Sequence, residues 1–229
     1  MSATNPPADL HGNLKTPYTK LDPAGLALLV IDAQNDFAHP RGAFPLPGLD
    51  GVVPRLVRAI ELFKAAGRPV IRVVRLYRPD GSNVDLCRRW QVEQGQLAWA
   101  APHDWGSQLV EASNPAGTKL AVEDLLAGRV QTLAPGDYVI YKPRFSAFVN
   151  TDLHQFLGRM GVNSLVIVGL TFANCVRATQ ISATDLDYRV GLVPDACTDT
   201  DAKGLAVMQA MGVQLMTMAD LEDLLAPAG

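Results

Sequence analysis

The sequence of 229 residues lacks the features that mark several specialised classes of protein. Its three cysteines, Cys87, Cys175 and Cys197, are too few for a disulfide framework, and no Cys-x-x-Cys pair indicates zinc. No apolar run approaches the length of a membrane span, and the first 20 residues lack the apolar core of a signal peptide. These absences favour a reducing, cytoplasmic setting without a membrane partner.

Charge of one sign and histidine are also scarce. The formal net charge is -3, with no basic patch or run of like charge, which argues against a nucleic-acid partner. The four histidines make no metal-ligand pattern because they lie far apart, at His11, His39, His103 and His154. We therefore expect neither a metal nor another cofactor. The turns after the predicted strands also lack G-x-G-x-x-G, so a dinucleotide-binding domain is a weak alternative.

The chain itself alternates between short apolar runs and helical patterns. Residues 1–24 are interpreted as an N-terminal arm, and residues 25–229 as one domain. Strands are predicted at 26–31, 70–74, 137–141, 165–168, 188–193 and 213–216. Alternation without a repeat or a linker is typical of a single α/β domain, in which helices cover both faces of one parallel sheet.

Residues 76–137 interrupt this alternation. The segment is long and irregular, and it contains all three tryptophans, Trp90, Trp99 and Trp105. Such an insertion often covers a site as a lid or builds an interface, although it is equally compatible with a surface excursion.

Cys175 falls where a predicted strand ends and a helix begins. Free backbone N–H groups and the helix dipole stabilise an anion at such a position, so a thiol there should ionise easily and act as a nucleophile. The alternative is that Cys175 is a small, buried, apolar residue.

Two further reactive side chains occupy equivalent positions, Asp32 after the first strand and Lys142 at the end of the third. Because the carboxyl ends of parallel strands share one edge of a sheet, Asp32, Lys142 and Cys175 are expected to meet there. Singly, Asp32 is compatible with a loop-stabilising residue and Lys142 with a solvated cation. Together, an acid, a cation and a thiol suit thiol-dependent acyl transfer.

Three motifs resemble the isochorismatase-like cysteine hydrolase family, and the resemblance covers roughly residues 22–220. They are VIDAQNDF at 30–37, KPRFSAF at 142–148 and GLTFANCVRAT at 169–179. The resemblance implies a Rossmann-like three-layer sandwich with a six-stranded parallel sheet in the order 3-2-1-4-5-6. It also implies a homodimer or homotetramer.

The resemblance further implies a catalytic triad of Asp32, Lys142 and Cys175. It places an unusual cis peptide bond between Leu170 and Thr171. The backbone N–H groups of Thr171 and Cys175 would then form an oxyanion hole.

Candidate substrate-binding residues lie close to these motifs. Phe37, Phe148 and Phe172 are candidate pocket walls, although they are equally compatible with core aromatics. Asn174 would position the turn before the cysteine, or only cap the helix. Arg144, with Arg75 and Arg78, would bind a substrate carboxylate, the alternative being ordinary surface arginines.

The expected function is hydrolysis of a C–N bond in a small amide, carbamoyl or ureido compound through a thioester. Nicotinamide is not favoured, because the residues after the second strand include no histidine for the metal site of nicotinamidases. Two alternatives stay open. One is hydrolysis of a vinyl ether as in isochorismatases, and the other is a catalytically silent binding or assembly protein.

Overall fold

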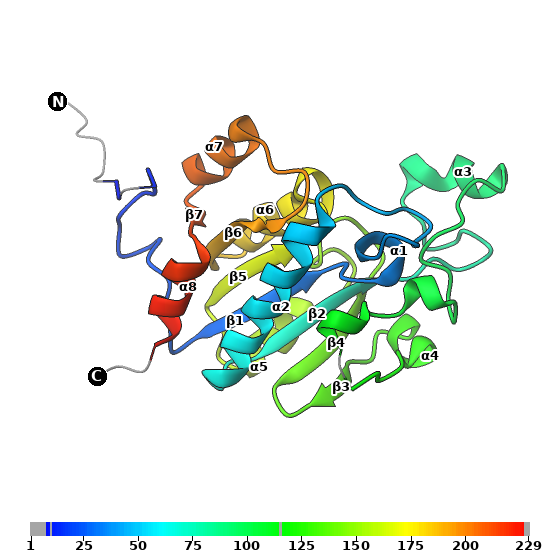
Figure 1. The fold of residues 1–229 in the computed structure, drawn as a ribbon, viewed down its shortest axis with the longest axis horizontal. Coiled ribbons are helices and arrows are strands. Elements are labelled where there is room, and N and C mark those ends of the chain that lie inside the picture. Colours follow the sequence, from blue (N-terminus) through cyan, green and yellow to red (C-terminus); the bar gives the residue numbers. More distant parts are fainter. Residues whose placement is uncertain (1–7, 10, 115, 227–229) are drawn as a thin grey trace.

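The computed structural model describes residues 8–9, 11–114 and 116–226, which build a central sheet covered by helices. The strands run in the order β3-β4-β2-β1-β5-β6-β7 (Figure 1). Their bounds are β1 Leu26–Ile31, β2 Val70–Arg75, β3 Gln131–Ala134, β4 Asp137–Lys142, β5 Ser164–Gly169, β6 Arg189–Cys197 and β7 Gln214–Leu215.

All neighbouring strands pair in parallel except β3 and β4, which are antiparallel. The six predicted strands thus follow the predicted order 3-2-1-4-5-6. The seventh, β3, is an edge strand that was not predicted. Its four residues are half-buried or exposed, so they lack the apolar run that reveals the inner strands.

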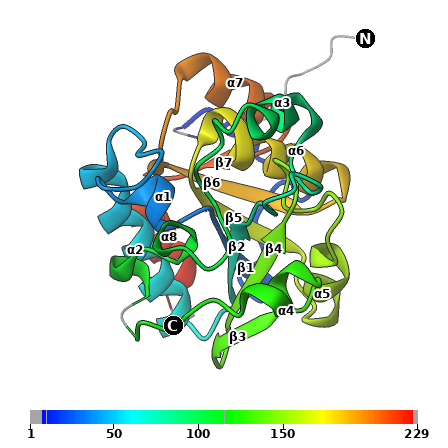
Figure 2. The same ribbon diagram turned by 90° about the vertical axis from the view of Figure 1, so that its right-hand side faces the viewer.

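Helices lie on both faces of this sheet. Their bounds are α1 Asn35–Ala38, α2 Leu49–Ala65, α3 Arg89–Glu93, α4 Val122–Leu126, α5 Leu153–Arg159, α6 Arg177–Asp185, α7 Ala202–Ala210 and α8 Met218–Leu225. Figure 2 shows α2 and α8 on one side of the sheet and α5 and α6 on the other.

The alternation of side chains along β1 explains the two layers. Leu26, Leu28 and Val30 share one core cluster with residues of α2 and α8. Ala27, Leu29 and Ile31 point the other way and share a second cluster with residues of α5, α6 and α7. Every residue of β1 is buried, which is why the strand is apolar throughout.

The described part of the N-terminal arm lies against the β7 edge of its own chain. The side-chain amide of Asn13 donates to the carbonyl of Leu215 (2.7 Å) and accepts from the N–H of Leu215 (2.8 Å). Leu21 is buried in the core under α2. The arm therefore covers an edge that would otherwise leave backbone groups unpaired. Residues 1–7 and 10 lie outside the described part.

The segment 76–137 runs from the carboxyl end of β2 back to β4. It contains α3, α4, β3 and three short 3₁₀ turns at Leu86–Arg88, Trp105–Ser107 and Glu111–Ser113. Its buried residues Val84, Ala100 and Val110 pack with Phe37 and Leu170 beside the carboxyl edge of the sheet. Over the described residues, no helix is both long and apolar enough to cross a membrane.

Candidate active site

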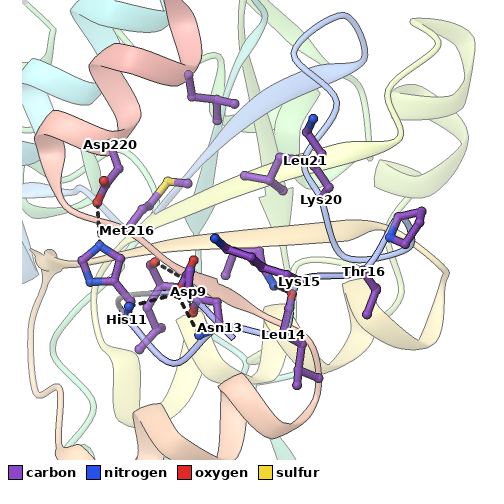
Figure 3. Close-up of a pocket in the computed structure, with 14 residues that line it drawn as sticks. Asp9, His11, Asn13, Leu14, Lys15, Thr16, Lys20, Leu21, Met216 and Asp220 are labelled. Carbon is purple, nitrogen blue, oxygen red and sulfur yellow. Dashed lines mark hydrogen bonds and ion pairs between the residues drawn. The ribbon is translucent and has the colours of Figure 1, made fainter. Parts of the chain in front are cut away.

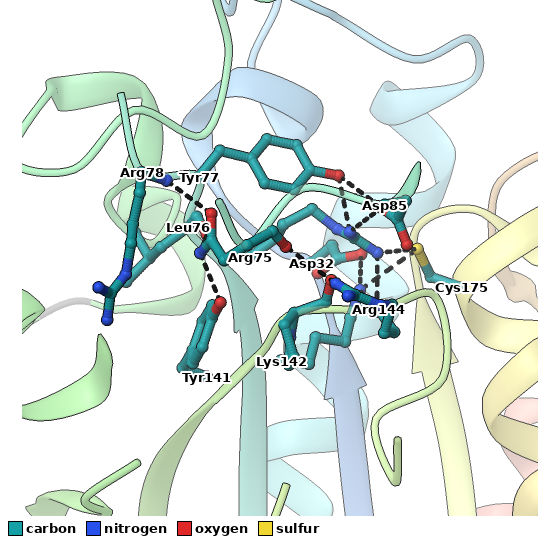
Figure 4. A network of polar contacts seen from close by, with 12 residues as sticks. Asp32, Arg75, Leu76, Tyr77, Arg78, Asp85, Tyr141, Lys142, Arg144 and Cys175 are labelled. Carbon is teal, nitrogen blue, oxygen red and sulfur yellow. Dashed lines mark hydrogen bonds and ion pairs between the residues drawn. The ribbon is translucent and has the colours of Figure 1, made fainter. Parts of the chain in front are cut away.

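Three strands bring Asp32, Lys142 and Cys175 together at the carboxyl edge of the sheet (Figure 4). Lys142 Nζ lies 2.8 Å from Asp32 Oδ2 and 3.3 Å from Cys175 Sγ. The side chain of Lys142 is fully buried, and that of Asp32 is nearly so. Buried polar groups of this kind need partners inside the protein, and here the three side chains supply them to one another.

The turn that carries the cysteine approaches β1 closely. A side-chain carbon at Gly169 would overlap the carbonyl oxygen of Ile31, so only glycine fits. The Leu170–Thr171 peptide bond is cis. The chain then enters a π-helical turn at Phe172–Val176, which leads directly into α6. Among the described residues, nothing accepts a hydrogen bond from the N–H of Thr171.

A second cation, Arg75, lies beside the thiol. It ends β2, directly opposite Lys142 in the register of the sheet. Its Nη2 lies 3.6 Å from Cys175 Sγ, and its Nη1 donates to Asp85 and Tyr77, both at 2.7 Å. Burial raises the pKa of Tyr77, so its hydroxyl stays protonated and donates to Asp85 (3.0 Å). Arg75 is therefore fixed by its own partners and presents a charge to the sulfur.

The thiol itself is protonated in the resting site. Burial raises the pKa of Cys175 and the charge of Asp32 raises it further, whereas Lys142 and Arg75 lower it in part. The prediction that the helix start makes this thiol easier to ionise is therefore wrong for the resting site. A protonated nucleophile requires a base beside it. Asp32 Oδ1, which is buried and has no partner among the described residues, suits that role.

The residues after Asp32 attach the insertion to the sheet. The Gln34 side chain donates to the carbonyls of Arg75 (2.8 Å) and Ser107 (2.7 Å). The side-chain amide of Asn35 donates to the carbonyl of Trp105 (2.9 Å). The motif that supplies the acid thus also positions the segment above it.

Asp36 performs a similar task for two loops at once. Its carboxylate accepts hydrogen bonds from the N–H of Ala43 (3.2 Å) and from that of Ala100 (2.7 Å). Ala43 belongs to the loop that follows α1, and Ala100 to the insertion. Both loops are thereby held over the end of the sheet.

The loop after α1 and the insertion together form a cover over the end of the sheet. A cavity of ≈ 50 Å³ lies between this cover and the reactive groups. The residues around it are Asp32, Phe37, Phe44, Leu46, Arg75, Arg88, Trp99, Leu170, Thr171, Asn174 and Cys175. This volume is far smaller than the roughly 300–1,000 Å³ of a typical ligand pocket. We therefore expect the cover to move when a substrate binds.

Only part of the predicted substrate-binding set lines this cavity. Phe37 and Asn174 do so. Phe172 is instead fully buried in the core, and Phe148 packs on Tyr188, with ring centroids 5.7 Å apart. The expectation that Phe148 and Phe172 line the pocket is corrected accordingly. Both rings pack in the core between the sheet and the helices α5, α6 and α7.

The predicted arginines are placed differently as well. Arg144 Nη1 donates to the carbonyls of Asn83 (2.9 Å) and Pro143 (2.8 Å), and only its own carbonyl oxygen faces the site, accepting from Arg75 Nη2 (2.8 Å). Arg78 reaches the carbonyl of Leu126 instead. Neither side chain lines the cavity, so the expectation that they bind a substrate carboxylate is corrected.

Four lining residues were not predicted: Phe44, Leu46, Arg88 and Trp99. The Trp99 ring contacts Phe37 and Tyr77, with centroids 5.4 and 5.1 Å apart. The one available signal was the concentration of tryptophan in the insertion, which indicated a cover without selecting a residue.

A divalent metal ion does not suit the end of β2. Zinc in proteins is bound by histidine, cysteine and carboxylate. Here the strand ends in Arg75, a positively charged residue that is not a metal ligand. Its guanidinium already pairs with the carboxylate of Asp85 (2.7 Å). Within the described ranges, no group of three or more histidine, cysteine, aspartate or glutamate side chains is arranged to hold a metal.

A much larger cavity is remote from these residues. It measures ≈ 690 Å³ and lies between the N-terminal arm, β7 and α8 (Figure 3). Its residues include Leu14, Lys20 and Met216, and it holds no cysteine. His11 Nε2 lies 3.1 Å from Asp220 Oδ2 at its border. The small cavity above Cys175, not the large one, therefore contains the groups capable of chemistry.

Comparisons with known proteins find matches over most of the chain. The isochorismatase domain model matches residues 26–220. A protein of Arabidopsis thaliana named a probable inactive nicotinamidase is 34% identical over 195 residues, 85% of this chain and 88% of its own length. The ureidoacrylate amidohydrolase RutB of Methylobacterium radiotolerans is 33% identical over 199 residues, covering 81% of this chain and 73% of its own.

Solved structures also superpose on most of the chain. An isochorismatase family protein from Desulfovibrio vulgaris superposes with a TM-score of 0.73 at 30% identity, over 88% of this chain and 98% of its own. The N-carbamoylsarcosine amidase of Thermoplasma acidophilum superposes with a TM-score of 0.66 at 25% identity, over 84% and 96%.

Proposed function

The chain belongs to the isochorismatase family, and from this premise we propose that it is a cysteine-dependent hydrolase of a C–N bond in a small amide, carbamoyl or ureido compound. The observation that carries the proposal is the contact of Lys142 Nζ with both Asp32 (2.8 Å) and Cys175 Sγ (3.3 Å). Two of its relatives, RutB and N-carbamoylsarcosine amidase, are named as enzymes that act on such compounds.

The first half of the proposed reaction forms a thioester. Asp32 takes the proton of the thiol as Cys175 Sγ bonds to the carbonyl carbon, and the carbonyl oxygen becomes an oxyanion. The N–H groups of Thr171 and Cys175 bind that oxyanion. The protonated Asp32 then gives its proton to the nitrogen, the C–N bond breaks, and ammonia or an amine leaves.

The second half regenerates the enzyme. Asp32 takes a proton from water, whose oxygen attacks the thioester carbonyl. The S–C bond breaks, the acid leaves, and the sulfur recovers its proton from Asp32. Lys142 and Arg75 stabilise the sulfur whenever it carries negative charge, because both cations lie within 3.6 Å of it.

Replacing the nucleophile tests the proposal. We expect Cys175→Ala to abolish ammonia release across a panel of amides, carbamoyl amino acids and ureido acids while its circular dichroism spectrum stays unchanged. The matched control is Cys197→Ala, because Cys197 is the other buried cysteine, ends β6 and lies outside the cavity. This control should retain activity.

Two other results would separate the alternatives. Activity that survives Cys175→Ala but not Asp32→Asn would favour hydrolysis of a vinyl ether instead. A wild-type protein that releases no ammonia from any compound of the panel would favour a silent member, in line with the name of the Arabidopsis relative. Slow alkylation of Cys175 would not decide this, because the raised pKa of its thiol predicts slow alkylation in an active enzyme as well.

A further inference from the structure

The arginine at the end of the first 3₁₀ turn of the insertion, Arg88, lines the same cavity as Cys175. Its guanidinium lies over two aromatic rings, 5.1 Å from the centroid of Trp99 and 4.9 Å from that of Phe145. Stacking of this kind holds a guanidinium in place while leaving its N–H donors free at the edge of the plane. Arg88 is thus held in position at the cavity that contains the nucleophile.

Arg88 also lacks a counter-charge. Within the part of the chain that the structure describes, no side-chain or backbone oxygen accepts from its guanidinium, and no carboxylate pairs with it. The nearest acidic group in the chain order, Asp85, is already taken by Arg75 and Tyr77. A half-buried arginine pays a desolvation cost that an anion would offset, and its planar fork matches a carboxylate with two hydrogen bonds.

The other arginine of the cavity cannot take this role. Arg75 uses Nη1 for Asp85 and Tyr77, and Nη2 for the carbonyl of Arg144 and the sulfur of Cys175. An incoming carboxylate would have to displace these partners. Recognition of a substrate charge therefore falls to Arg88.

From this geometry we infer that Arg88 binds an anionic substituent of the substrate, so the site takes small carboxylic acids that carry an amide or ureido group. The inference rests on the proposed hydrolase function and adds a substrate class and a specificity-determining residue to it. The carboxylate would lie at Arg88 under Trp99, and the scissile carbonyl at Cys175.

Binding to a Cys175→Ser protein tests the inference without requiring turnover. The probes are two matched pairs, succinamate with succinamide and N-carbamoylglycine with N-carbamoylglycinamide, titrated calorimetrically at neutral pH. We expect each acid to bind at least about 10-fold more tightly than its neutral counterpart, the range for hydrogen bonds to a charged group. Adding Arg88→Gln should weaken the acids by about 10- to 100-fold and change the neutral compounds by less than about 3-fold.

The matched control is Arg89→Gln, which removes the same charge one residue away. Arg89 does not line the cavity, and its Nη2 reaches the carbonyl of Ser82 instead, so both acids should bind as before. The conservative variant, Arg88→Lys, should keep part of the preference, since it retains the charge but not the fork. Equal affinity for acids and neutral compounds, no binding of either acid, or an equal loss for both classes in Arg88→Gln would overturn the inference.

These outcomes are distinct from failure of the hydrolase proposal. Ammonia release by the wild-type protein from neutral amides alone would overturn the role of Arg88 and leave the hydrolase in place. Arg88-dependent binding of acids, without ammonia release from any of them, would do the reverse.

Discussion

The strand ends and the loops above them hold their charges in different ways. At the strand ends, Asp32, Arg75 and Lys142 are buried and paired with partners in the same protein. In the cover, Arg88 and Trp99 are half-buried, and their contacts are with aromatic rings. Under the proposed function, this difference would assign the chemistry to the sheet and the control of access and selection to the loops.

The largest effect should come from breaking the pair at the strand ends. Asp32→Asn removes the base, so we expect ammonia release to fall by about 10⁴-fold or more. It also leaves Lys142 buried without an opposite charge, which should lower the free energy of unfolding by about 3–5 kcal/mol. Urea denaturation and an ammonia assay measure the two effects.

A double variant separates stability from chemistry. Adding Lys142→Met to Asp32→Asn removes the uncompensated charge, so stability should recover while activity stays absent. More than about 1% of wild-type activity in Asp32→Asn would contradict the assignment of the base.

A smaller loss is expected from the second cation. Replacing Arg75 and Asp85 together, by Gln and Asn, keeps the net charge and removes the positive group 3.6 Å from the sulfur. We expect kcat to fall by about 10- to 100-fold with KM within about 3-fold, because the charge acts on the reacting sulfur and not on the distant part of the substrate. A raised KM with unchanged kcat would instead assign Arg75 to binding.

The cover should respond in the opposite sense. Trp99→Leu removes a ring that packs on Phe37, Tyr77 and Arg88, so we expect KM to rise by about 10-fold with kcat within about 3-fold. Trp90→Leu is the control, because that ring is 53% exposed and lies outside the cavity. Steady-state kinetics on one substrate measures both. A large fall in kcat for Trp99→Leu would show that the two regions are not separable.

The smallest effect is expected at Arg144. Only its carbonyl oxygen faces the site, and Arg144→Ala keeps that oxygen. KM for an acidic substrate should therefore change by less than about 2-fold, an effect within the range of surface substitutions. A rise comparable to that of Arg88→Gln would place the carboxylate at Arg144 and not at Arg88.

Prediction from the sequence worked where periodicity was strong. The inner strands are continuous apolar runs, whereas the order of the six parallel strands was implied by the family that the three motifs resemble. It missed β3, whose exposure pattern carries no such signal. It also misplaced Phe148 and Phe172, because an aromatic residue that follows a strand can turn toward the cavity or toward the helices, and local sequence does not choose between them.

The residues of the cover were out of reach for a different reason. Phe44, Arg88 and Trp99 come from segments without periodicity, and their approach depends on hydrogen bonds such as those of Asp36 to Ala43 and Ala100. These bonds join residues that are 7 and 64 positions apart in the chain. Neither contact can be predicted from the local sequence.

By itself, the sequence determined that an acid, a cation and a thiol end three strands of one parallel sheet, because parallel strands bring their carboxyl ends to a common edge. Only the tertiary structure decided the protonation of that thiol and the identity of its neighbours. The pKa of Cys175 is set by burial and by charges up to 143 positions away (175 − 32). The charge of Arg88 is left without a carboxylate partner among the described residues because of how the surrounding loops are placed. Both quantities depend on distances across the fold, which no single segment of the chain contains.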